Sequence, residues 1–448
     1  MSRQLFGTDG IRGVAGQYPL DRETVHAVGM ALGSWSMSHS DAPEVVIGMD
    51  TRESGPWIAE EVAGGLAREK VKARLAGLIT TPGVAYLTRT GPFVAGVMIS
   101  ASHNPFADNG IKVFAHNGYK LPDYEEMKLE QRIFACKNEG AEPVAMTPED
   151  YLGRQYLDYL ASTFSETLAG KKLVVDCGNG AASYLGPALL RRLGAEVLAI
   201  GAEPNGRNIN LNCGALHVDA LCKRVVEERA NAGFAFDGDA DRCIAVSGSG
   251  RIIDGDAVLL IVARHLHLQG RLNANGDGPL VVATVMSNLG LEKALAAEGI
   301  LLLRTAVGDK YVLEEMLKKG ARIGGEQSGH VIFLEQATTG DGLLTALRVL
   351  EVMCATGRSL DELTIGLSVF PQKLVNVRVK ERKPLSDLAA VQSAIQDAER
   401  GLGDDGRVLV RFSGTEPLAR VMVEGPTNEV VDHHVHRIAD TIRAELGG

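Results

Sequence analysis

Short apolar segments alternate with longer helical patterns along most of the chain, and this alternation restricts the fold more than any other feature. Val45 to Met49, Leu173 to Asp176 and Leu280 to Thr284 are typical of buried strands, and each precedes a polar loop and a helical pattern. The helices are expected at about 56–69, 184–193 and 289–298. This repeated order of strand, loop and helix predicts α/β domains.

The three strand–loop–helix units resemble one another, and we interpret them as a weak threefold repeat of one α/β domain. The loops after their first strands are Asp50-Thr51-Arg52, Cys177-Gly178-Asn179-Gly180 and Val285-Met286-Ser287-Asn288. Three unrelated α/β units are the alternative. Ligands of open α/β sheets bind at the carboxyl ends of strands, so three such domains can direct those ends into one central cleft.

The last 80 or so residues follow a different pattern, which predicts a small α+β domain. Strands are expected at 372–379, 407–412 and 419–424, and helices at 385–400 and up to Leu446. A chain of 448 residues is too long for one hydrophobic core. We therefore predict three similar α/β domains plus a C-terminal α+β domain around a central cleft. Their expected bounds are 1–150, 151–252, 253–369 and 370–448.

Composition and charge narrow the class of protein. Hydrophobic residues make up 45% of the chain and charged residues 23%, as in globular proteins. A formal net charge of −10 disfavours a nucleic-acid-binding protein. The six cysteines form no Cys-x-x-Cys pair and are expected to be reduced thiols. Arg3 and Asp9 interrupt any apolar start, and no apolar run reaches the roughly 20 residues of a membrane span. We therefore expect a soluble, cytoplasmic protein without a membrane partner.

The segment from Met98 to Pro105, Met-Ile-Ser-Ala-Ser-His-Asn-Pro, follows the apolar run Phe93 to Ile99. A hydroxyl beside an imidazole, in a loop that follows a strand, is typical of a nucleophile or a phosphate carrier. A polar loop that only caps the next element is the alternative.

A second segment, Asp237-Gly238-Asp239-Ala240-Asp241-Arg242, places three carboxylates at a spacing of two residues. Their mutual repulsion, roughly 1 kcal/mol per pair at 4 Å in water, is removed by a bound cation. Oxygen ligands without His or Cys favour Mg²⁺. A calcium loop is excluded, because Arg242 and Gly248 occupy its glycine and glutamate positions. A solvated acidic turn is the alternative.

Two further glycine-containing segments carry polar groups. Gly324 to His330, Gly-Gly-Glu-Gln-Ser-Gly-His, offers groups that suit sugar hydroxyls and proton transfer, although a glycine-rich turn between strands explains it equally well. Arg411-Phe412-Ser413-Gly414-Thr415-Glu416-Pro417, with Arg420, is typical of a phosphate site, with a polar hairpin as the alternative. Arg12, among glycines near the start, and Lys310, at an expected helix N-terminus, are lesser anion-binding candidates.

These four main segments occur in this order in the α-D-phosphohexomutase superfamily, which the chain resembles over essentially its whole length. Gln327, where enzymes acting on unaminated sugars usually carry Met, and the opening Phe-Gly-Thr-Asp-Gly-Ile-Arg-Gly are similar to the bacterial branch that acts on glucosamine phosphates. One segment departs from the expected pattern. Asn212-Cys213-Gly214 precedes Ala215-Leu216-His217 where a more polar run is expected, so the sequence assigns no role to His217.

The resemblance implies four domains around a cleft and a phosphorylated Ser102 that exchanges phosphoryl groups with the sugar through a 1,6-bisphosphate. It implies isomerisation of glucosamine 6-phosphate to glucosamine 1-phosphate, for UDP-N-acetylglucosamine and peptidoglycan synthesis. A hexose 1,6-bisphosphate of glucosamine or glucose would be the activator, and the chain would form a homodimer through its N-terminal domain.

The resemblance also implies roles for individual residues. Mg²⁺ would be held by Asp237, Asp239, Asp241 and a phosphate oxygen on Ser102. Lys112 or His103 would transfer the proton, with Lys112 slightly favoured as base, and Arg242 would neutralise charge on the transferred group. The expected substrate contacts are Arg12, Lys310, Glu326, Ser328, His330, Arg411, Ser413, Gly414, Thr415 and Arg420.

Three other functions stay open from the sequence. A phosphomannomutase/phosphoglucomutase would act on unaminated sugar phosphates with the same residues. A phosphatase with Asp237 as nucleophile would release free phosphate without needing Ser102. A non-catalytic sugar-phosphate sensor would bind sugar phosphates without turning over phosphate on Ser102.

Overall fold

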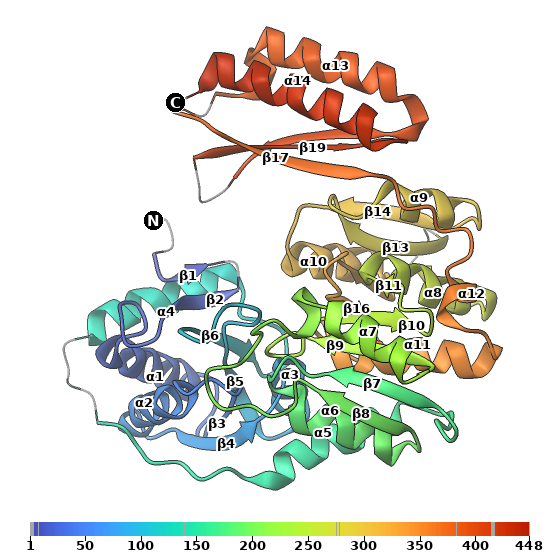
Figure 1. Ribbon diagram of the computed structural model, residues 1–448. Coiled ribbons are helices and arrows are strands. Elements are labelled where there is room, and N and C mark those ends of the chain that lie inside the picture. Colours follow the sequence, from blue (N-terminus) through green and yellow to red (C-terminus); the bar gives the residue numbers. More distant parts are fainter. Residues whose placement is uncertain are drawn as a thin grey trace. The chain divides into compact units, whose positions relative to one another are not determined.

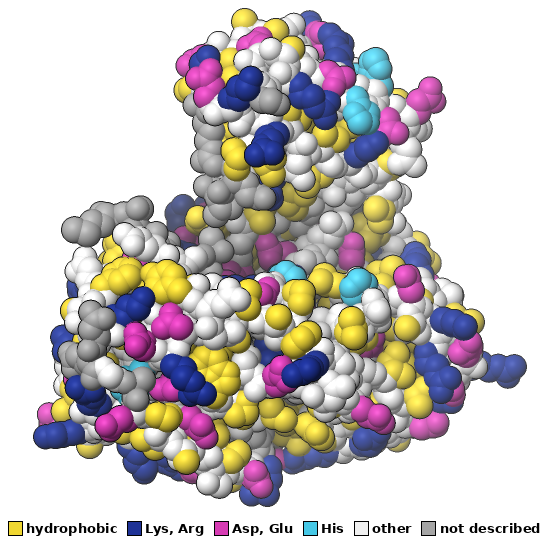
Figure 2. Space-filling model, turned by 60° about the vertical axis from the view of Figure 1, so that its left-hand side comes forward, with side chains coloured by type: hydrophobic (Ala, Val, Ile, Leu, Met, Phe, Trp, Pro, Cys, Tyr) yellow, Lys and Arg dark blue, Asp and Glu magenta, His cyan; other side chains and the backbone are white. Residues whose placement is uncertain are grey.

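The computed structural model describes residues 4–7, 9–137, 140, 142–274, 276, 278–381, 383–413 and 417–447 (Figure 1). The chain divides into two compact units, Met1–Met286 with Leu302–Ile365 and Ser287–Leu301 with Gly366–Gly448. Of the helices in these described ranges, none combines the length and the hydropathy that crossing a bilayer requires. Figure 2 shows Lys and Arg side chains mixed with Asp and Glu over the visible face.

The first sheet has six strands in the order β1-β2-β6-β5-β3-β4. They are β1 (Phe6–Gly7), β2 (Gly10–Val14), β3 (Glu44–Met49), β4 (Lys72–Leu78), β5 (Phe93–Ile99) and β6 (Asp108–Ala115). The helices are α1 (Arg22–Met37), α2 (Gly55–Arg68), α3 (Thr81–Thr90) and α4 (Asp123–Cys136). The apolar strands β3 and β5 pair in parallel and are buried almost throughout, as is usual inside an α/β domain.

The second sheet has the order β11-β10-β9-β7-β8. Its strands are β7 (Lys172–Asp176), β8 (Glu196–Ile200), β9 (Ala232–Phe236), β10 (Cys243–Ser247) and β11 (Ile252–Ile253). The associated helices are α5 (Asp150–Ser162), α6 (Ala182–Arg192), α7 (Asp219–Glu227) and a 3₁₀ turn, Gly214–Leu216.

The third sheet has the order β12-β13-β15-β16, and β14 also pairs with β13. Its strands are β12 (Asn273–Ala274), β13 (Gly278–Thr284), β14 (Leu301–Thr305), β15 (Ile323–Gly325) and β16 (Val331–Phe333). The helices in this part of the chain are α8 (Gly255–Leu268), which precedes β12, α10 (Asp309–Lys319), which lies between β14 and β15, and α11 (Gly342–Thr356) and α12 (Leu360–Leu363), which follow β16.

The three sheets share one strand arrangement, which supports the interpretation of a threefold repeat. In each sheet a first strand (β3, β7 or β13) pairs in parallel with a later strand (β5, β9 or β15). That later strand then pairs antiparallel with the strand that follows it (β6, β10 or β16). The loop between these last two strands contains the serine segment in the first sheet, the aspartate segment in the second and the Glu326–His330 segment in the third. The same topological position therefore carries all three.

The second unit contains an antiparallel sheet in the order β17-β19-β18. Its elements are β17 (Gln372–Arg378), β18 (Arg407–Phe412), β19 (Leu418–Glu424), α9 (Leu289–Ala296), α13 (Ala389–Leu402), α14 (Asn428–Leu446) and a 3₁₀ turn, Gly403–Asp405. The predicted helix at 385–400 is wrong at its start, where a 3₁₀ turn, Leu385–Asp387, precedes α13. Pro384 and Asp387 favour a turn over a helix there. With this correction, the predicted fold class of three α/β domains and a C-terminal α+β domain is confirmed.

Candidate active site

A cavity of about 400 Å³ in the first unit is lined by side chains from all three α/β sheets and their loops. Among the residues predicted from the sequence, it contains Arg12, Ser102, His103, Asp241, Arg242, Glu326 and His330. Asp237, Asp239 and Lys112 are buried and are not part of this lining, but Asp237 contacts the lining residue Ser102 and Lys112 contacts the lining residue Asp241. The structure therefore brings together residues that are more than 300 positions apart in the sequence.

Ser102 lies in the loop after β5, and its side chain faces the aspartate segment. Its hydroxyl donates a hydrogen bond of 2.6 Å to Asp237 Oδ2, and His103 Nδ1 lies 3.3 Å from the Ser102 hydroxyl oxygen. Its φ of 52° is left-handed, a conformation that costs a non-glycine residue about 1–3 kcal/mol. Burial lowers the pKa of His103, and Arg242 and Arg12 lower it further.

The carboxylates of Asp237, Asp239 and Asp241 each offer an oxygen within 4.8 Å of the other two. They lie on the turn after β9, where Ala240 has a φ of 55°. Burial raises the pKa of Asp237 well above its usual value, and the charges of Asp241 and Asp239 raise it further. Burial acts in the same direction on Asp239, but Lys112 and the Thr81 hydroxyl outweigh it and lower that pKa.

Lys112 on β6 is buried among three carboxylates. Its Nζ lies 2.8 Å from Asp239 Oδ2, 3.0 Å from Asp9 Oδ2 and 3.5 Å from Asp241 Oδ2. Burial disfavours the ammonium form, but these carboxylates outweigh it and hold the pKa well above the usual value. In this arrangement Lys112 is a cation that balances the charge of the aspartates.

Arg12 and Asp9 connect the N-terminal strands to the serine loop. The guanidinium of Arg12 pairs with Asp9, and its Nη1 donates to Ala101 O at 3.4 Å. Asp9 also accepts from Lys120 at 2.5 Å. Asp9 was not predicted as a site residue, because a single aspartate between glycines gives no local indication of partners distant in sequence.

The third-sheet segment contributes Glu326 and His330 to the cavity. Glu326 Oε1 accepts from the backbone N–H of Gly308 at 3.3 Å, and His330 Nε2 lies 3.8 Å from Asp309 Oδ2. Ser328 lies at the exposed tip of the same turn and is not part of the cavity lining.

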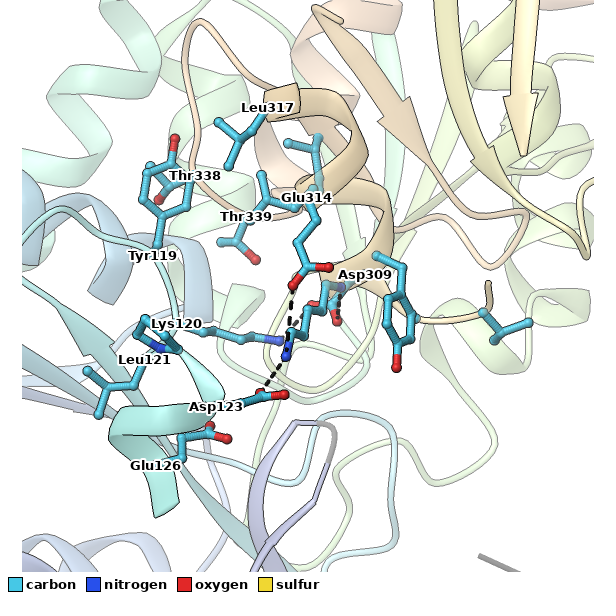
Figure 3. Close-up of a pocket in the computed structure, with 17 residues that line it drawn as sticks. Tyr119, Lys120, Leu121, Asp123, Glu126, Asp309, Glu314, Leu317, Thr338 and Thr339 are labelled. Atoms are coloured by element: carbon cyan, nitrogen blue, oxygen red, sulfur yellow. Dashed lines mark hydrogen bonds and ion pairs between the residues drawn. The ribbon is translucent and has the colours of Figure 1, made fainter. Parts of the chain in front are cut away.

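Lys310 is not brought together with the other predicted residues. It lines a second cavity, of about 420 Å³, where its Nζ pairs with Asp123 and lies 3.9 Å from Glu314 Oε1. Figure 3 shows Lys120 and Asp309 beside these acidic side chains. Val307, Gly308 and Asp309 line both cavities, so this second space adjoins the first. The geometry gives no support to a substrate contact by Lys310.

The predicted phosphate segment lies in the second unit. Arg411 on β18 is directly opposite Arg420 on β19, and Ser413 follows β18 and is buried. Burial lowers the pKa of Arg411, and the neighbouring Arg420 lowers it further. Two adjacent guanidiniums suit an anion. Gly414 and Thr415 lie outside the described residues.

Comparison with known proteins bears on the whole chain. Family models described as phosphoglucomutase/phosphomannomutase domains I, II, III and the C-terminal domain match residues 3–139, 154–250, 254–367 and 374–441. The phosphoglucosamine mutase of Solibacter usitatus is 61% identical over 449 residues, with 100% of both chains covered. That of Koribacter versatilis is 50% identical, covering 99% of this chain and 98% of the relative. The chain belongs to the phosphoglucosamine mutase family.

Phosphoglucosamine mutases are isomerases of the phosphohexomutase superfamily, and solved structures agree with this fold. A phosphoglucomutase/phosphomannomutase family protein of Burkholderia thailandensis has a TM-score of 0.81 at 24% identity, covering 98% of this chain and 97% of that chain. The N-acetylphosphoglucosamine mutase of Aspergillus fumigatus, solved with GlcNAc-6P and magnesium, has a TM-score of 0.65 at 18% identity, covering 99% and 96%. At these identities the likeness shows the fold alone.

Proposed function

We propose that this chain interconverts glucosamine 6-phosphate and glucosamine 1-phosphate, with Ser102 as the phosphoryl carrier. The observation that carries the proposal is the 2.6 Å hydrogen bond from the Ser102 hydroxyl to Asp237, inside a cavity that also contains Glu326 and His330. Relatives of 61% and 50% identity that bear the phosphoglucosamine mutase name support the choice of sugar. The product would serve UDP-N-acetylglucosamine and peptidoglycan synthesis.

The aspartate segment fits a divalent cation. Asp239 Oδ1 and Asp241 Oδ1 are buried and accept no hydrogen bond, so they are available as ligands. The donor set is oxygen only, which favours Mg²⁺. Asp237, Asp239 and Asp241 would hold the ion together with a phosphate oxygen on Ser102. When bound, the ion neutralises charge on the phosphoryl group during transfer.

In the reaction, phosphorylated Ser102 donates its phosphoryl group to the free hydroxyl of the sugar phosphate, which gives a 1,6-bisphosphate. The sugar then reverses its orientation, and Ser102 takes back the other phosphoryl group. Arg242 and Arg12 neutralise charge beside Ser102. Of the two candidates for proton transfer, His103 accepts and returns the proton of the sugar hydroxyl, because the surrounding carboxylates hold Lys112 in its ammonium form.

The remaining predicted residues hold the substrate. Glu326, Ser328 and His330 bind sugar hydroxyls. The phosphate that is not being transferred is bound by Arg411, Ser413, Gly414, Thr415 and Arg420. A hexose 1,6-bisphosphate activates the enzyme, because it transfers one phosphoryl group to Ser102 and is released as a hexose monophosphate.

A substrate panel tests this function. Glucosamine, glucose and mannose 6-phosphates are each assayed with Mg²⁺ and a catalytic amount of glucose 1,6-bisphosphate, and kcat/KM is compared. We expect glucosamine 6-phosphate to be preferred at least tenfold, or by about 1.4 kcal/mol. Equal or better use of glucose or mannose phosphate would instead indicate phosphoglucomutase or phosphomannomutase activity. Release of free phosphate without isomerisation would indicate a phosphatase.

A further inference from the structure

A buried guanidinium holds the backbone of the serine loop from behind. Arg52 follows β3, and its side chain is completely shielded from solvent. Its Nη2 donates to Ser102 O at 2.9 Å and to Asn104 O at 2.8 Å. Its Nη1 donates to Asp108 O at 2.9 Å and to Pro105 O. Four of its five N–H groups are therefore bonded to carbonyls of one short loop.

The fifth N–H connects Arg52 to the other side of Ser102. Arg52 Nε donates to Asp50 Oδ2 at 2.9 Å, and the Ser100 hydroxyl donates to the same carboxylate oxygen at 2.6 Å. The Ser100 oxygen in turn accepts from the backbone N–H of Ser102 at 2.9 Å. Both the N–H and the carbonyl of Ser102 are thus fixed by one network.

This network acts where the backbone is strained. Ser102 has a φ of 52°, and Asn210 Nδ2 donates a further hydrogen bond of 2.9 Å to its carbonyl. Gly238 of the aspartate segment packs so closely that a Cβ there would lie 2.4 Å from the Ser102 carbonyl oxygen. A left-handed serine persists only when its surroundings enforce it.

We propose that Arg52, acting with Asp50 and Ser100, is a positioning residue that holds Ser102 in the conformation required for phosphoryl transfer. The inference rests on the proposed role of Ser102 as the carrier. Arg52 does not touch the substrate, since it is fully buried and absent from the cavity lining. Its contribution therefore concerns the rate of transfer and not the affinity for sugar phosphate.

Two variants test this role at different severity. Arg52→Lys keeps the charge but has three donors in place of a planar fork with five, so it cannot hold the same carbonyls. Ser100→Ala removes only the hydroxyl between Asp50 and the Ser102 N–H. Arg348→Lys is the matched control, because Arg348 is also buried and donates to a backbone carbonyl, Thr163 O, but lies outside the cavity lining.

The measurements are kcat, KM and the single-turnover rate at which glucose 1,6-bisphosphate phosphorylates Ser102, on the full chain. We expect kcat and the phosphorylation rate to fall together, about 10-fold in Ser100→Ala and about 100-fold in Arg52→Lys, with KM within threefold. Arg348→Lys should stay within twofold of wild type.

Retention of wild-type kcat in folded Ser100→Ala and Arg52→Lys would overturn the inference. So would a rise in KM at unchanged kcat, which would place Arg52 in substrate binding. If Arg52→Lys does not fold, the kinetics of Ser100→Ala alone test the inference. An active Ser102→Ala variant would instead refute the proposed function itself, so the two failures are distinguishable.

Discussion

Replacing Ser102 by alanine removes the hydroxyl that donates to Asp237, and we expect mutase turnover to fall by at least about 10⁴-fold. Without that oxygen no phosphoryl group can be carried between the two positions of the sugar. The measurement is isomerisation of glucosamine 6-phosphate, with transfer of labelled phosphate from glucose 1,6-bisphosphate to the protein as a second readout. Ser183→Ala, a buried serine at the start of α6, is the control. Turnover near the wild-type level would contradict the mechanism.

Replacing Asp239 by asparagine tests the metal site. The change preserves shape but removes one of three clustered charges, so we expect the Mg²⁺ concentration for half-maximal activity to rise at least about tenfold. In this variant the buried ammonium of Lys112 would still pair with Asp9 and Asp241, so we expect the site to stay folded. A Mg²⁺ titration of activity checks this, and an unchanged midpoint would count against Asp239 as a ligand.

The site could be predicted from the sequence where its chemistry lies within one short segment. Asp237, Asp239 and Asp241 are an example, because their spacing alone indicates a cation. Arg52 and Thr81 were not predicted as site residues, since their partners are 50 and 158 residues away and single side chains give no local signal. Lys310, in contrast, was predicted as a substrate contact but does not line the cavity that contains Ser102. The direction of a side chain at the start of a helix depends on tertiary packing, which the local sequence does not indicate.

At the scale of elements, the first strand of each repeat was predicted closely, whereas the antiparallel last strands were not. Strand β3, for example, was expected at 45–49 and spans Glu44–Met49. The strands β6, β10 and β16 follow polar loop segments, those before β10 and β16 contain glycine, and β16 has only three residues. Hydrophobic periodicity is weak in a strand as short as β16, and pairing with a neighbouring strand determines it.

Helix α11 begins at a buried carboxylate that makes its stability depend on pH. Asp341 accepts from Leu344 N at 2.9 Å and from the Tyr156 hydroxyl at 2.8 Å. Burial raises the pKa of Asp341 from 3.8 to about 6. The folded state therefore binds this proton more tightly than the unfolded state. Its stabilising contribution is complete below pH 3.8 and is lost as the pH rises through 6.

Asp341→Asn should remove this dependence, because asparagine is also a good helix N-cap and stays neutral. The free energy of unfolding of the wild type, relative to the variant, should fall between pH 4 and pH 7 by on the order of 3 kcal/mol. Denaturant titrations of both proteins at several pH values measure this difference. The comparison at pH 4, where both side chains are largely neutral, is the internal control, and a difference that did not vary with pH would contradict the assignment.

At the scale of the whole molecule, Ser102 belongs to the first unit and the facing pair Arg411 and Arg420 belongs to the second. If this pair binds the phosphate that all substrates share, its loss should weaken every substrate equally. Arg420→Gln should raise KM about tenfold for glucosamine and glucose 6-phosphates alike, since a charge-assisted hydrogen bond is worth about 1.5–3 kcal/mol.

Glu326→Gln should instead change the ratio of kcat/KM between the two sugars, because Glu326 lines the cavity that contains Ser102.

Steady-state kinetics of both variants with both sugars separate these effects. Arg378→Gln is the matched control, because Arg378 lies exposed on β17 of the same antiparallel sheet. An unchanged KM in Arg420→Gln would contradict phosphate binding by the second unit. A KM that rose for only one sugar would mean that Arg420 recognises the sugar and not the phosphate, because the phosphate group is common to both substrates.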